Sequence, residues 1–270
     1  MIFVPGGTVD MYGGTIESVA QDMTKIGQGG NVYLGSKGIF NMYGGAISNG
    51  RTDQEGGNVY VSNATFNLIA GLISGGNGIN GGNIYVTDGT LKLTGGTVEG
   101  GYASSGGSLY LKDTTFEMSG GTITGGQAEG NGGNFFSSGA TKATITGGGI
   151  VGGIVGNSGA DYYVNNAAAT LTISNAQLGA MRVRSIGSLT VSGVTRIAEL
   201  RLEEGEKLTI GELEAGTEIG VIATGVFSET NENAETYLKN GYFISVPADQ
   251  TIAVADNALY AEYAPEGAVK

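Results

Sequence analysis

The sequence predicts an all-β, single-domain right-handed parallel β-helix, a solenoid with three strands in each rung of about 25 residues. Three observations support this fold class. Two independent motifs recur with one shared period, the apolar runs alternate as strands do, and the chain holds 52 glycines but only 3 prolines. The glycines occur as doublets between apolar segments and not at every third position, which excludes a collagen-like chain.

The two motifs define the rung. The first motif occurs as GGNVYL, GGNVYV, GGNIYV, GGSLYL, GGNFFS and GADYYV, beginning at Gly29, Gly56, Gly81, Gly106, Gly132 and Gly159. The second motif occurs as MYGGTI, MYGGAI, LIAGLI, LTGGTV, MSGGTI and ITGGGI, beginning at Met11, Met42, Leu68, Leu93, Met118 and Ile145. Both recur every 25 to 31 residues, which favours a stack of similar supersecondary units.

Each repeat contains three short apolar runs separated by Gly, Asn, Asp and Ser, which predicts three strands and three turns. Alternate residues of a strand point to opposite faces, so one set should form the core. The inward residues are Val32, Leu34, Val59, Val61, Ile84, Val86, Leu109 and Leu111 in the first strand, Phe40, Met42, Phe66, Leu68, Leu91, Leu93, Phe116 and Met118 in the second, and Ile47, Ile73, Val98, Ile123 and Ile150 in the third. Every set is apolar. The intervening second-strand residues, such as Asn41, Lys92 and Glu117, are polar and should face water.

The carboxyl end departs from this pattern. After Gly179 the repeat shortens, since Leu189 and Leu208 occupy equivalent positions only 19 residues apart. We expect a β-helix over residues 1–220 and carboxy-terminal rungs with a β cap over 221–270, with strands at 242–246, 251–254 and 258–263. Residues 2–4 already fit a first strand with no cap before it. We therefore expect either that an upstream part of the chain has been removed or that this uncapped first rung packs on a second copy to form a dimer.

Composition excludes several function classes. The net charge of −12 disfavours nucleic acids as partners, because nucleic-acid binding depends on Lys and Arg. Cysteine and histidine are both absent, which rules out thiol nucleophiles, a Ser/His/Asp triad and the common zinc ligands. No apolar run is long enough for a membrane helix, so we expect no membrane insertion.

An aromatic ladder is the candidate binding feature. Its members occupy the outward position of the first strand in successive rungs, namely Phe3, Tyr33, Tyr60, Tyr85, Tyr110, Phe136 and Tyr163, followed by Arg182 and Arg201. Rings at rung spacing stabilise one another by offset stacking, and Arg182 would lie over the last ring as a cation on a π face. The ladder either holds rungs together or offers a contact strip, with Tyr33, Tyr60, Tyr85, Tyr110, Phe136, Tyr163 and Arg182 as the binding residues.

Two further groups of polar residues have simpler interpretations. Asn31, Asn58, Asn83 and Asn134, interrupted by Ser108 and followed by Asp161, stand where the chain bends into the first strand, and turn chemistry explains them. The acids of the variable third loop, Glu17, Asp22, Asp53, Glu55, Glu99 and Glu129, lack the spacing of a known calcium motif. We therefore predict no cofactor and no metal site, with calcium left open as a ligand of these loops.

An enzyme of this shape would need converging carboxylates with Arg or Lys beside them. Asp10, Glu117 and Asp161 lie in different rungs and strands, and Arg182, Arg184 and Arg196 have no Asp nearby in the sequence. We predict no catalytic residues, and a polysaccharide lyase or glycoside hydrolase stands as the alternative function.

The stretch TFEMSGGTI at Thr115, the GGN motifs and the closing segments from Leu200 to NALYAEY resemble repeats of large adhesin-like secreted and cell-surface proteins of gut Firmicutes. The resemblance covers nearly the whole chain and implies an extracellular location on a bacterial cell surface. It implies attachment to a glycan or protein on a host or microbial surface, or a stalk role, and it assigns no site residue. The sequence thus favours a structural, adhesin-like module, with an end-to-end assembling subunit as a further alternative.

Overall fold

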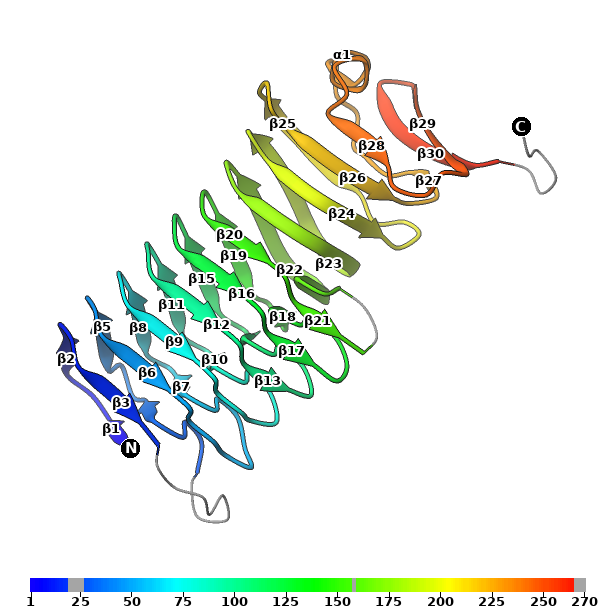
Figure 1. Cartoon of the computed structure of the whole chain (residues 1–270). Coiled ribbons are helices and arrows are strands. Elements are labelled where there is room, and N and C mark those ends of the chain that lie inside the picture. Colours follow the sequence, from blue (N-terminus) through cyan, green and yellow to red (C-terminus); the bar gives the residue numbers. More distant parts are fainter. Residues whose placement is uncertain (19–26, 157–158, 265–270) are drawn as a thin grey trace.

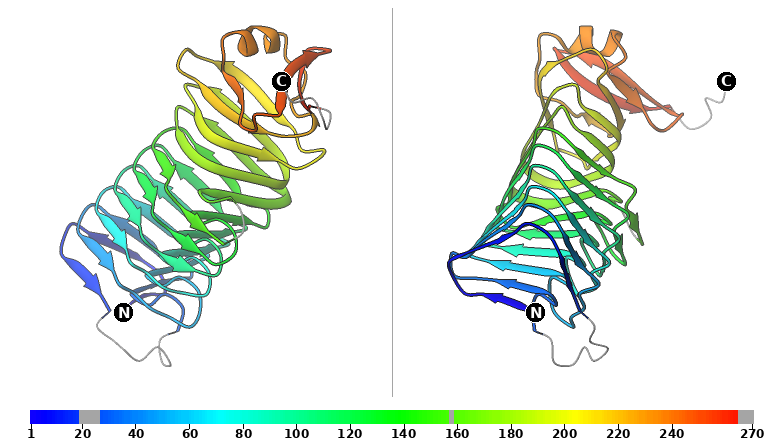
Figure 2. Two further views of the ribbon diagram at one scale, coloured as in Figure 1. Left: turned by 45° about the vertical axis from the view of Figure 1, so that its right-hand side comes forward. Right: turned by 60° about the vertical axis from the view of Figure 1, so that its left-hand side comes forward.

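The computed structural model describes residues 1–18, 27–156 and 159–264. The chain is all-β, and a long sheet of parallel strands runs from one end of the molecule to the other, as in a β-solenoid (Figure 1). The amino-terminal strands lie at one end, and the helix α1 (Ala234–Lys239) lies with the last strands at the other (Figure 2).

Up to residue 151 the strands fall into three parallel series. The first series is β1 (Ile2–Val4), β4 (Val32–Leu34), β7 (Val59–Ser62), β10 (Ile84–Thr87), β14 (Leu109–Lys112) and β18 (Phe135–Ser138). The second is β2 (Thr8–Met11), β5 (Ile39–Met42), β8 (Thr65–Leu68), β11 (Thr90–Leu93), β15 (Thr115–Met118) and β19 (Lys142–Ile145). The third is β3 (Thr15–Glu17), β6 (Ala46–Ser48), β9 (Leu72–Ser74), β12 (Thr97–Glu99), β16 (Thr122–Thr124) and β20 (Gly149–Val151).

A count of three strands does not describe every rung. The third loop contributes a small parallel sheet of its own, formed by β13 (Tyr102–Ala103), β17 (Gln127–Ala128) and β21 (Ile154–Val155). These strands could not be predicted from alternating apolar residues, because each of them is only two residues long.

Beyond residue 160 the short strands merge into long ones. These are β22 (Tyr162–Ser174), β23 (Gln177–Gly193), β24 (Arg196–Leu202), β25 (Leu208–Leu213) and β26 (Glu218–Ile222). β22 alone pairs with both β18 and β19, so it spans the first and second series. Leu189 pairs with Leu208, which confirms the shortened repeat.

The predicted core is confirmed. Every inward residue that the alternation assigned, from Val32 to Ile150, is at most 1% exposed. In the glycine doublets that precede the first strand, the backbone lies too close to neighbouring backbone atoms to leave room for a side chain. Gly81, for example, has a φ of +62°, and a Cβ there would lie 2.3 Å from the carbonyl oxygen of Ile84.

The last described segment changes character. It contains β27 (Gly225–Val226), α1 (Ala234–Lys239), β28 (Phe243–Ser245), β29 (Gln250–Ala255) and β30 (Ala258–Tyr263). β28 continues the parallel stack on β26, whereas β27, β30 and β29 form an antiparallel sheet. The three strands expected after residue 240 are present, but α1 was not predicted, since six residues are too few for helical periodicity to show. In the described residues, no helix has the length and apolar character needed to cross a membrane.

Candidate functional site

The aromatic ladder forms one continuous stack. Phe3, Tyr33, Tyr60, Tyr85, Tyr110, Phe136 and Tyr163 follow one another in register, with neighbouring ring centroids 4.8 to 5.5 Å apart and interplanar angles of 4° to 28°. Each interior ring therefore covers the faces of the rings before and after it.

Because the rings cover one another, their side chains are less exposed to solvent than their outward position on the strand suggests. Tyr60 and Tyr163 are only 7% and 4% exposed, whereas Tyr33, Tyr85 and Tyr110 are half-buried and Phe3 is 59% exposed. Burial raises the pKa of Tyr60 and of Tyr85 above the ordinary value, and the neighbouring phenols Tyr33 and Tyr110 respectively add to the shift. Ring edges, and not ring faces, are what the interior of the strip presents to a partner.

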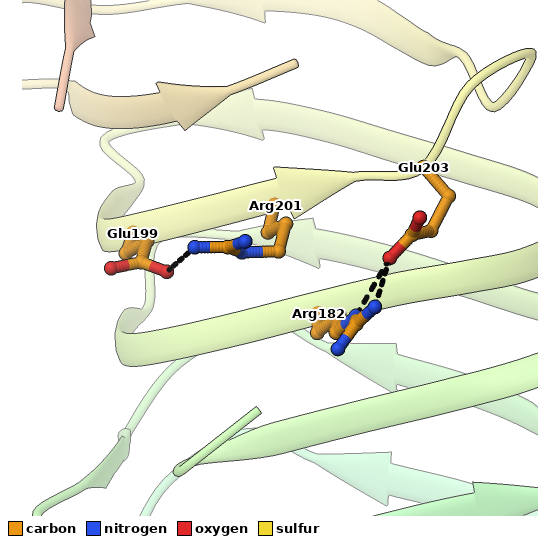
Figure 3. Close-up of polar contacts among 4 residues, drawn as sticks. All are labelled: Arg182, Glu199, Arg201 and Glu203. Atoms are coloured by element: carbon orange, nitrogen blue, oxygen red, sulfur yellow. Dashed lines mark hydrogen bonds and ion pairs between the residues drawn. The ribbon is translucent and has the colours of Figure 1, made fainter. Parts of the chain in front are cut away.

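A pair of arginines continues the ladder in register. Tyr163 lies opposite Arg182, and Arg182 lies opposite Arg201 on the next strand. The Arg182 guanidinium forms an ion pair with Glu203, in which Nε donates a hydrogen bond of 2.8 Å to Oε1 (Figure 3). Arg201 forms a second ion pair, with its Nη2 3.6 Å from Glu199 Oε1 (Figure 3). These cations are thus neutralised by carboxylates of β24 and the residue that follows it.

The four asparagines of the asparagine ladder are buried, and the side chain of each forms hydrogen bonds. Asn58 Nδ2 donates to Asn83 Oδ1 and to the Ser74 carbonyl, each at 2.8 Å, while its Oδ1 accepts from the Gly50 amide at 2.8 Å. The same pattern links Asn31 to Asn58 and Asn134 to Asp161. The predicted turn role is therefore correct. The residue with left-handed backbone is the first glycine of the doublet, two residues before the asparagine, as at Gly56 and Gly81.

Two members of the asparagine ladder differ from the rest. Ser108 is fully buried, and its Oγ has no hydrogen-bond partner among the residues that the structure describes. Asp161 is 4% exposed, so its carboxylate does not point outward, and it accepts hydrogen bonds from the amides of Gly153 and Ala180 and from Asn134 Nδ2. Burial raises the pKa of this carboxyl, and the three hydrogen bonds oppose the shift.

The loop acids are held separately. Glu17 accepts a hydrogen bond of 2.7 Å from Asn49, Glu129 one of 2.7 Å from Tyr102, and Glu55 one of 3.3 Å from Gln28. Asp22 lies outside the described residues. Over residues 1–18, 27–156 and 159–264, no group of three or more acidic side chains is placed to hold a metal ion.

A hollow of about 740 Å³ lies between the end of β25 and the segment that carries α1, at a place that sequence reasoning missed. A stacked pair of tyrosines, Tyr237 and Tyr242, forms part of its lining. The other lining residues are Ile210, Gly211, Glu212, Leu213, Thr230, Asn231, Glu232, Asn233, Thr236 and Asn240. The only sequence signal for it is the polar run TNENAET after residue 229, where the repeat has ended.

Comparison of the chain with protein-family models, curated proteins and solved structures found no match in any of the three.

Proposed function

We propose that the chain is an extracellular structural module, a stalk or attachment segment of a bacterial surface protein, whose repeating unit is a right-handed coil of three-strand rungs. The observation that supports this proposal is the unbroken stack of seven rings running along the first strand series. Each stacked pair adds about 0.5 to 1.5 kcal/mol to rung–rung association, so the ladder stiffens the solenoid along its length.

The buried asparagine ladder supports the same role from inside the turn. Amide side chains that bond both to the neighbouring rung and to the third strand fix the rungs in register. A module built to keep its length and register under load benefits from two such parallel ladders.

Localisation and mechanics test the stalk proposal. Antibodies raised against the recombinant chain should label intact cells that produce the natural protein, and protease treatment of those cells should remove the label. Pulling the chain by its two ends should give a lower unfolding force after Tyr60→Ala, Tyr85→Ala and Tyr110→Ala than after the three matching Phe substitutions. An intracellular location, or equal forces for both triple variants, would contradict the proposal.

Glycan attachment through the ladder is the second candidate function. The observation in its favour is that Tyr33, Tyr85 and Tyr110 are only half-buried, so part of each side chain remains open to solvent. A glycan array should then show binding that both triple variants lose, because the Phe substitutions keep the stack but remove the hydroxyls. Binding retained by the Phe variant would exclude the hydroxyl edges as the contact.

A further inference from the structure

The hollow beside α1 is bounded on two sides by residues that hydrogen-bond to β25, namely Tyr237 and Asn231. β25 carries a bulge, since Val191 lies opposite Ile210 but Gly193 lies opposite Leu213. Bulges interrupt the backbone ladder and commonly occur next to functional sites. The Tyr237 hydroxyl occupies this interruption: it accepts a hydrogen bond from the Leu213 amide at 3.3 Å and lies 3.5 Å from the Gly211 carbonyl, to which it donates.

The opposite wall is fixed by Asn231. Its Nδ2 donates to the Ile210 carbonyl at 2.7 Å, and its Oδ1 accepts from the Asn233 amide at 2.8 Å. The loop that follows Thr230 is thereby tied to the strand across the hollow. A site whose walls are set by internal hydrogen bonds loses little entropy when a ligand enters, which favours binding.

The chemistry of the lining indicates the ligand class. The Tyr237 and Tyr242 rings stack with centroids 5.8 Å apart, and Tyr242 is half-buried, so part of its surface is open to solvent. Around the rings stand exposed acceptors and donors, among them Glu212, Glu232 and Asn233. Apolar ring surface next to convergent hydrogen-bonding groups suits a sugar, which has an apolar face and a rim of hydroxyls.

Charge narrows the class further. The lining holds two glutamates and neither lysine nor arginine, and the whole chain has a net charge of −12. Anionic sugars would therefore meet repulsion at the site. The volume of about 740 Å³ lies within the range of roughly 300 to 1,000 Å³ that is typical of small-molecule sites.

We propose that the hollow between β25 and α1 binds an uncharged saccharide unit of a glycan, with Glu212, Glu232 and Asn233 bonding its hydroxyls and Tyr242 packing on its apolar face. This site deepens the attachment part of the proposed function and moves it away from the aromatic ladder. The stalk role does not depend on it.

A glycan array of neutral oligosaccharides, together with sialylated and uronate-bearing counterparts, tests the site. We expect binding to at least one neutral glycan, and weaker binding to its acidic counterpart. The double variant Glu232→Ala/Asn233→Ala should weaken that binding about tenfold or more, since a hydrogen bond to a charged group is lost. Glu235→Ala, on the adjacent exposed face of α1, is the matched control and should leave binding unchanged.

Each other outcome overturns the inference in a recognisable way. If circular dichroism shows that the chain is folded and it binds no neutral glycan, the proposed saccharide site is wrong. The stalk role would not be affected by that result. Binding kept by the Glu232→Ala/Asn233→Ala variant but lost on Tyr60→Ala, Tyr85→Ala and Tyr110→Ala would place attachment on the aromatic ladder instead. Preference for acidic glycans would contradict the charge argument.

Discussion

At the scale of single residues, the described chain shows how one position can depart from a repeated pattern. Four rungs place an asparagine where the chain enters the first strand, and each forms hydrogen bonds with its neighbours or with the third strand. The Ser108 side chain is too short to reach these partners, and in the described part of the chain its buried hydroxyl has no hydrogen-bond partner. A buried polar group without a partner lowers stability by roughly 1 to 3 kcal/mol.

Ser108→Asn is therefore expected to stabilise the protein by about 1 kcal/mol, because it completes the ladder between Asn83 and Asn134 and gives the Gly101 amide an acceptor, as Asn83 does for Gly76. The free energy of unfolding in urea measures this change. Ser108→Ala is the control, since it removes the unpaired hydroxyl without supplying new bonds. A destabilised Asn variant would show that the rung lacks room for the amide.

The tyrosine ladder also predicts a pH dependence. The pKa values of Tyr60 and Tyr85 are raised in the folded state, chiefly by burial. Their contribution to stability is fully present below the unfolded pKa of about 10 and is lost as the pH rises through the higher folded values. Phenolate absorbance should show fewer ionised tyrosines in the native protein than in the denatured chain between pH about 10 and 12. Coincident titration curves would mean that the rings are not buried in solution.

At the scale of elements, the strands of three or four residues from β4 to β20 are stable because each is paired with a parallel strand on both sides and fixed by ladders of like side chains. The ladders depend on two properties of each rung: a ring at the middle of the first strand and a glycine doublet just before it. Both properties can be tested with matched substitutions.

Tyr85→Ala should lower the free energy of unfolding by about 1 to 3 kcal/mol, because it removes two stacked contacts, with Tyr60 at 5.5 Å and Tyr110 at 5.0 Å. Tyr85→Phe keeps both contacts and should lie close to the wild type. Chemical denaturation of the two variants measures the difference, and equal losses would assign the effect to the hydroxyl.

Gly81→Ala should destabilise by more than Gly100→Ala. Both glycines have a φ of +62°, so both substitutions bring the same backbone strain, but only at Gly81 would the new Cβ meet backbone atoms, at 2.3 Å from the Ile84 carbonyl oxygen. The expected costs are about 1 kcal/mol at Gly100 and at least about 2 kcal/mol more at Gly81. The difference in free energy of unfolding between the two variants, measured by heat or urea, gives the cost of the contact between the new Cβ and the backbone at position 81. Similar losses of stability in both variants would show that the turn at Gly81 can relax.

At the scale of the whole molecule, each rung contacts chiefly the rungs before and after it (Figure 1). Stability in such a solenoid is a sum of rung and interface contributions, so damage should stay local. The merged strands β22 and β23 pair along much of their length and should form the most persistent part of the stack.

Phe66→Ala tests this locality. The ring is fully buried and stacks on Phe40 at 5.3 Å, so its loss should cost about 3 to 5 kcal/mol. Amide hydrogen exchange should accelerate in β5, β8 and β11 while β23 and β24 keep their protection. Asn67→Ala, on the outward side of the same strand, is the control: it removes one part-buried hydrogen bond of 2.7 Å from Asn67 Nδ2 to Asn41 Oδ1 but no core contact, so its effect should be smaller, about 1 kcal/mol. Uniform acceleration throughout the chain would indicate cooperative unfolding of the whole solenoid.

The sequence by itself determined the parallel stack, its register and its core. Alternation assigns Phe40, Phe66 and Phe116 to the interior without ambiguity, because a slip of one residue would turn every apolar side chain outward. The repetition of the motifs then aligns the rungs, and the aromatic and asparagine ladders follow from that alignment.

Only the tertiary structure decided how open these ladders are and where a hollow forms. The burial of Tyr60 depends on the rings of Tyr33 and Tyr85 stacked on its two faces, and the lack of a partner for the Ser108 hydroxyl among the described residues depends on distances to neighbouring rungs. The hollow joins Glu212 at the bulge of β25 with residues near α1, from Thr230 to Tyr242. These segments are not related by the sequence repeat. They come together only through the path of the chain after the last regular rung, and repeated sequence motifs predict only contacts that recur from rung to rung.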